Sequence, residues 1–108
     1  MMRPALILLG LALVAPASVN GQTRPVTCSR DLLQNQAGMN RQLRLLRDSG
    51  TADQAAQCKI WRDHVGFLQQ ARSVFASCQS GAERERNVAQ MDSELGEFRG
   101  LLAGRCKR

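Results

Sequence analysis

Four cysteines are the residues of this sequence whose type and spacing point to a specific chemistry, disulfide formation. They are Cys28, Cys58, Cys78 and Cys106, and no two of them are closer than 20 positions. That spacing excludes the Cys-x-x-Cys pattern of zinc fingers and redox centres. An even number of cysteines in a short exported chain is typical of a disulfide framework.

Four cysteines allow three pairings, and helix geometry excludes two of them. Cys58 and Cys78 lie on one expected helix about 30 Å apart, whereas the Cα atoms of a disulfide are about 6 Å apart. Cys78 and Cys106 are likewise separated by a full helix length. The remaining arrangement joins Cys28 to Cys78 and Cys58 to Cys106, with one disulfide at each end of the domain. Each disulfide closes a loop of about 50 residues, which is worth roughly 4 kcal/mol in the chain-entropy model.

The other reactive side chains predict no catalytic, cofactor-binding or metal site. His64 is the only histidine. It lies on an apolar helix face with no metal ligand near it in sequence, which predicts a structural histidine. Glu94 and Glu97 stand three residues apart, as carboxylates on solvated helix faces commonly do. There is no Gly-x-Ser-x-Gly motif, no phosphate-binding glycine loop and no cysteine left unpaired, so we expect a protein that is not an enzyme.

A helix expected from Ala52 to Cys78 positions most of these residues. Its apolar residues follow two stripes with steps of three and four residues. The stripes are Cys58, Trp61, Val65, Leu68 and Phe75, and Ile60, His64, Phe67, Ala71, Val74 and Cys78. They lie about 80–100° apart on the helical wheel, so two neighbouring helices are needed to cover them. The Trp61 stripe is expected to face the third helix and the His64 stripe the first, which agrees with the disulfide pairing.

The two flanking helices are predicted from shorter apolar stripes and from helix-end signals. The first helix is expected to begin after an extended Thr27–Ser29 segment, with Ser29 as N-cap, and to end where Gly50 adopts a left-handed conformation. Thr51 with Gln54, and Ser80 with Glu83, are expected capping boxes of the next two helices. The expected core faces are Leu32, Gln36, Met39, Leu43 and Leu46 in the first helix, and Val88, Met91, Leu95, Phe98 and Leu102 in the third.

The N-terminus has the pattern of a secretory signal peptide. Arg3 precedes an apolar run from Ala5 to Val14, and Ala15-Pro16-Ala17 follows it. We expect cleavage after Ala17, with Gly21 as the alternative, and no transmembrane span in the mature chain. The sequence thus predicts a signal peptide over residues 1–17, an extended polar tail over 18–27, and an all-α domain over 28–108. This domain is a small antiparallel three-helix bundle stapled by two disulfides.

The amino-acid composition suggests the cellular location of the protein. The chain has a net charge of +6 with thirteen arginines against two lysines. The arginine bias, beside much alanine, glycine and leucine, is typical of a GC-rich bacterial genome. The expected destination is therefore the bacterial periplasm or the medium.

Two surface patterns suggest binding. An arginine-rich surface is a candidate site for an anionic polymer or membrane surface. The sparse aromatic residues argue against specific nucleic-acid recognition. A face of small residues on the third helix is a candidate docking site for a protein partner or a second copy. The arginine-rich surface comprises Arg30, Arg41, Arg44, Arg47, Arg105, Lys107 and Arg108, and the small-residue face comprises Ala89, Ser93, Gly96, Gly100 and Ala103.

From these patterns we expect an exported, non-enzymatic helical binding or structural module. The alternative is an envelope-associated protein that binds anionic polymers or a membrane surface through its arginines.

Overall fold

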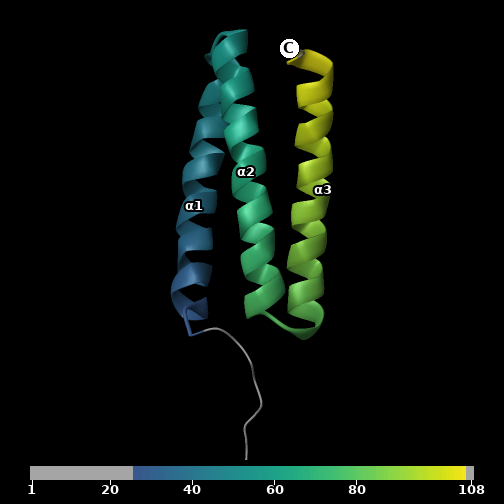
Figure 1. Ribbon diagram of the computed structural model, residues 1–108. Coiled ribbons are helices and arrows are strands. Elements are labelled where there is room, and N and C mark those ends of the chain that lie inside the picture. The colour runs from purple at the N-terminus through teal and green to yellow at the C-terminus, as the bar shows by residue number, and fades with distance from the viewer. Residues whose placement is uncertain (1–25, 107–108) are drawn as a thin grey trace, which may run out of the picture.

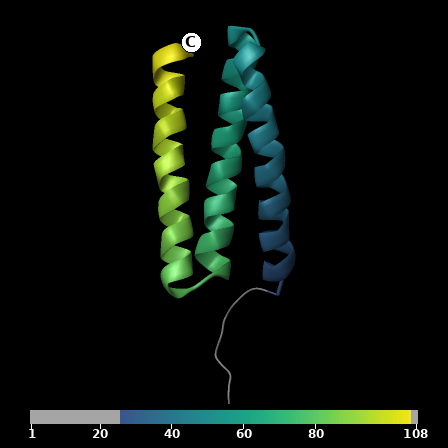
Figure 2. The same cartoon turned by 180° about the vertical axis from the view of Figure 1, so that it is seen from behind.

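The computed structural model describes residues 26–106, which form three long helices and a short connecting turn. α1 spans Cys28–Asp48, the 3₁₀ turn η3 spans Ser49–Thr51, α2 spans Gln54–Cys78 and α3 spans Gly81–Arg105. The helices run antiparallel with α2 in the middle, as both views show (Figure 1, Figure 2). The prediction of an all-α antiparallel bundle is confirmed. The predicted signal peptide, most of the predicted tail, Lys107 and Arg108 lie outside the described residues.

Both predicted disulfides are present. Cys28 is bonded to Cys78 with a Cα–Cα distance of 5.4 Å, and Cys58 is bonded to Cys106 with a Cα–Cα distance of 5.8 Å. The first joins the start of α1 to the last residue of α2, and the second joins the first turn of α2 to the end of α3. One disulfide therefore lies at each end of the bundle.

The apolar core lies mainly between α2 and α3. Leu68 and Ala71 of α2 pack with Met91 and Leu95 of α3 in one buried cluster. Partly buried side chains surround this cluster, namely Met39, Val65, Phe67, Phe75 and Phe98. The described part of α1 packs against α2 and makes no close backbone approach to α3. α2 is therefore the shared neighbour, and it continues as one helix through Gly66.

The predicted core face of α1 is wrong. Residues buried in α1 are Cys28, Asn35, Gly38 and Gln42. Leu43, expected in the core, is 52% exposed, and Gln36 is exposed as well. Leu32, Met39 and Leu46 are only half-buried. The helix is thus rotated so that small and polar side chains face α2, because the predicted stripe ranked side chains by hydrophobicity alone.

The predicted N-terminal caps of the first two helices are also wrong, whereas α1 ends at Asp48 and α2 at Cys78 as expected. Thr27, not Ser29, is the N-cap of α1, and its Oγ1 donates a hydrogen bond of 2.9 Å to Asp31. No extended segment is needed at Cys28, because η3 lengthens the link between α1 and α2 and brings Cys28 level with Cys78. Asp53 caps α2 by accepting a hydrogen bond of 2.8 Å from the Ala56 amide, in place of the expected Thr51 box.

Glycine geometry at the two turns differs from the prediction. Gly50 lies inside η3, and Gly81 is the one glycine with positive φ (62°) in residues 26–106. Ser80 is the N-cap of α3 as expected, but it makes no side-chain capping hydrogen bond. The tight α2–α3 turn therefore depends on the backbone freedom of Gly81, which is the residue type that favours this conformation.

Candidate functional site

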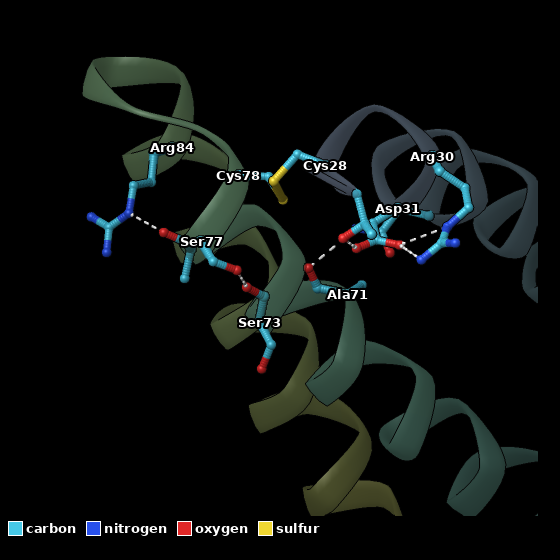
Figure 3. Close-up of a disulfide and its surroundings, with 11 residues drawn as sticks. Cys28, Arg30, Asp31, Ala71, Ser73, Ser77, Cys78 and Arg84 are labelled. Carbon is cyan, nitrogen blue, oxygen red and sulfur yellow. Dashed lines mark hydrogen bonds and ion pairs between the residues drawn. A yellow bond between two sulfur atoms is a disulfide. The ribbon is translucent and has the colours of Figure 1, made fainter. Parts of the chain in front are cut away.

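The contact between α1 and α2 is a polar seam with four levels. The Cys28–Cys78 disulfide forms the first level (Figure 3). At the other three levels, Asn35 Nδ2 donates to the Ala71 carbonyl at 3.2 Å, Gln42 Oε1 meets His64 Nδ1 at 2.9 Å, and Gln57 Nε2 donates to the Ser49 carbonyl at 3.0 Å. Each step of seven residues along α1 is matched by seven residues back along α2. A repeat of seven is the period at which two packed helices keep one face in contact.

The seam contains the buried polar side chains of the described chain. These are Asn35, Gln42, Ser49 and His64. Buried polar groups are costly unless they are hydrogen-bonded, and the amide and imidazole groups here have partners. Such pairs contribute little net stability but favour one alignment of the helices over others. The seam therefore fixes how α1 lies on α2 and which face of α1 points outward.

Gly38 is a residue of the seam that sequence reasoning missed. A Cβ at this position would lie 2.6 Å from Cε1 of Phe67, so the Phe67 ring occupies the space that any other residue would fill. Gly38 follows Asn35 by three residues and precedes Gln42 by four, which is the helical spacing of a buried face. That spacing is the signal that could have identified the seam.

His64 is buried and hydrogen-bonded, as the sequence predicted for a structural histidine. It is 1% exposed, and its ring meets Phe98 edge-on with centroids 4.6 Å apart. Since an amide oxygen only accepts, the hydrogen bond with Gln42 Oε1 places the proton on Nδ1. Burial lowers the pKa of His64, and the nearby carboxylate of Glu94 on α3 opposes part of that shift. The imidazole is thus held neutral in the seam.

We expect the folded protein to lose stability as pH falls through the unfolded-state pKa of His64, near 6.5. The folded-state pKa is lower than the unfolded one, so below about pH 6.5 the unfolded chain binds the proton more readily than the folded chain does. Urea denaturation of wild type and of His64→Gln, at pH 7.5 and at pH 5.5, measures the effect. The wild type should lose more of its unfolding free energy than the variant, and equal losses would contradict the assignment.

Beside the seam, α1 carries a partly exposed apolar strip, here called the leucine strip, formed by Leu32, Met39, Leu43 and Leu46 together with Gln36. It borders a hollow of about 120 Å³ between α1 and α2. Met39 packs against the core cluster that α3 shares, so the strip borders the open side of the bundle between α1 and α3. The hollow is lined by Leu32, Asn35, Gln36, Met39, Ala71 and Phe75.

On the other side of the seam lies a larger and more polar groove of about 290 Å³. Asp31 and Arg41 stand towards its two ends on α1, and Gln70 belongs to its α2 side. Asp31 already contacts Arg30 at 3.4 Å and accepts a hydrogen bond from Thr27. The carboxylate of Asp31 in this groove therefore already has partners within the protein.

The residues of the predicted arginine surface lie at different places in the structure. Arg41, Arg44 and Arg47 are exposed on the C-terminal half of α1 and take part in none of the ion pairs formed within residues 26–106. Arg105 lies over the Trp61 ring, 5.6 Å from its centroid, at the end of the bundle where α1 ends. Arg30 lies at the opposite end, so the predicted residues do not form one continuous surface.

The small-residue face of α3 is exposed along its whole length, from Ala89 to Ala103. Nothing lies within 4 Å of the position that a Cβ would take at Gly96 or Gly100. The face is thus open, and what it binds stays a prediction. Glu94, expected on a solvated face, is half-buried and accepts a hydrogen bond of 3.2 Å from Gln90.

The geometry of residues 26–106 bears on two further classes of site. No group of three His, Cys, Asp or Glu side chains in this range is placed to hold a metal ion. None of the three helices combines the length and apolar character that a membrane-crossing helix requires. Comparison with protein-family models, with curated proteins and with solved structures gave no match to this chain.

Proposed function

We propose that the protein is an exported, non-enzymatic binding module that holds a protein partner against the leucine strip of α1. The observation that carries the proposal is the inverted burial of this helix, which turns Asn35 and Gln42 inward and leaves Leu43 exposed. Burying a leucine side chain is worth about 1.5–3 kcal/mol. A helix that forgoes this gain presents apolar surface for another molecule to cover.

The polar seam supports this proposal because it explains why Leu43 is exposed. The disulfide at Cys28 and the amide contacts of Asn35 and Gln42 hold α1 in one rotational setting. α1 cannot turn its leucines inward without leaving these polar groups unpaired, at about 1–3 kcal/mol for each buried group. The strip is therefore presented as a fixed surface.

Export to the periplasm or the medium is part of the proposal. Two disulfides suit an oxidising compartment, and the N-terminal pattern around Arg3 and Ala17 is that of a signal peptide.

A second candidate function is binding of an anionic polymer or membrane surface. The observation in its favour is that Arg41, Arg44 and Arg47 are exposed and outside the ion pairs of the described residues. Binding of this kind weakens steeply as salt is added, because exposed charges are screened. A packed apolar contact depends much less on ionic strength.

Retention of an envelope protein on immobilised oxidised bait tests the proposal. We expect the wild type and Leu33→Asp to retain the same partner and Leu43→Asp to lose it, because Leu33 is 71% exposed but lies outside the strip. The retention should persist at 0.5 M salt, where the Debye length falls to about half of its value of about 8 Å at physiological salt. Loss of the partner at that salt together with its loss in Arg44→Glu would favour the anionic-surface function, and equal retention by all baits would contradict the leucine strip.

A further inference from the structure

The leucine strip has the dimensions of a helix-binding surface. It extends from Leu32 to Leu46, which is about 21 Å, or four turns, along α1. Its members recur at steps of three and four residues, the spacing at which one helix meets another. α1 and α3 both pack on α2 without close backbone approach to each other in the described chain, so the side of the bundle between them is not closed by a contact of these two helices.

Charge around the strip is positive at one end. Arg47 follows Leu43 by four residues, so the two side chains are neighbours on α1. Arg44 follows Leu43 by one residue and lies about 100° further around α1. Arg105, which lies over the Trp61 ring, is the last residue of α3, and α3 ends at the end of the bundle where α1 ends (Figure 1). Arg44 and Arg47 form no ion pair within residues 26–106. The carboxylate of Glu94 on α3 is half-buried and lies close enough to His64 to act on its pKa.

We propose that the open side between α1 and α3 binds an amphipathic helix of a partner protein, with acidic residues beside its apolar face at the Arg47 end. This inference rests on the proposed function, and it adds the conformation and charge of the partner. Apolar contacts with Leu43 and Met39 supply the binding energy. The arginines select the charge and orientation of the bound helix, since charged rims contribute to specificity more than to affinity.

Three designed peptides test the proposal by fluorescence anisotropy with the oxidised mature protein. The first has a leucine stripe flanked by glutamates, the second has the same stripe flanked by lysines, and the third has the composition of the first in scrambled order. We expect the first to bind at least about tenfold more tightly than the other two, which corresponds to 1.4 kcal/mol or more. Leu43→Asp should weaken its binding by about tenfold, whereas Leu33→Asp should leave the binding unchanged.

The variant Arg44→Glu/Arg47→Glu then tests the role of charge. This variant should bind the lysine-flanked peptide in preference to the glutamate-flanked one. Circular dichroism shows whether each variant keeps its helices, and thiol titration shows whether it keeps its disulfides. Equal binding of the scrambled peptide would overturn the proposal and assign the surface to polyanions. Binding of the lysine peptide to the wild type through Leu43 would overturn the acidic partner but keep the proposed function. Failure of every peptide, with envelope capture that is independent of Leu43, would overturn both.

Discussion

Replacing Cys28 and Cys78 by alanine is expected to release α1 while α2 and α3 stay paired. The disulfide closes a span of 50 residues, and its loss should cost about 2–5 kcal/mol. Without it, α1 is held by the hydrogen bonds of the seam, each worth about 0.5–1.5 kcal/mol. Hydrogen exchange with mass spectrometry should show amides of α1 losing protection at pH 7, whereas the amides around Leu68 and Leu95 keep theirs.

The matched control is the removal of Cys58 and Cys106. This disulfide closes a span of 48 residues, so its effect on chain entropy is nearly the same. The expected loss of protection now falls on the end of α3 and the start of α2, because Gln54 also hydrogen-bonds the Arg105 carbonyl there. If both variants lost protection uniformly over all three helices, α1 would belong to the same cooperative unit as the core.

Leu68→Ala is expected to be among the most destabilising single substitutions in the domain. Leu68 is 0% exposed at the centre of the cluster with Ala71, Met91 and Leu95. Truncation of a buried leucine leaves a cavity and costs about 2–5 kcal/mol. Urea denaturation of the oxidised protein gives this loss directly, as a lower midpoint at unchanged slope.

Leu43→Ala is the comparison that distinguishes core from surface. Because Leu43 is half-exposed and does not belong to the buried cluster, we expect its truncation to change the unfolding free energy by less than about 1 kcal/mol. A loss as large as that of Leu68→Ala would place the leucine strip in the core and remove the basis for a binding surface there.

Hydrophobic periodicity predicted α2 and α3 well because both helices bury apolar stripes. Trp61 and Leu68 of one stripe are buried as expected, and so are Met91 and Leu95 of α3. The disulfide pairing was also predictable, since the reach of a disulfide is short compared with the length of a helix. These features depend on average properties of side chains, which the sequence displays directly.

α1 could not be predicted in the same way, because its orientation depends on specific hydrogen bonds. The stripe through Leu43 is more apolar than the one through Asn35 and Gln42, yet the latter faces α2. This orientation pairs the buried amides with the Ala71 carbonyl and with His64, and those partners are identified only when both helices are in place. Two signs of this face were present in the sequence: the seven-residue spacing of Cys28, Asn35, Gln42 and Ser49, and the place of Gly38 between two of them.

The matched heptads of α1 and α2 have a consequence for oxidative folding. Sliding α1 by one heptad towards the α1–α2 turn would set Cys28 beside Ala71 and Asn35 beside His64, so no thiol would face another. In the native alignment Cys28 meets Cys78 while Asn35 and Gln42 also meet their partners on α2. Of the alignments that differ by one heptad, only the native one allows this disulfide to form, so its formation makes the native alignment of α1 permanent.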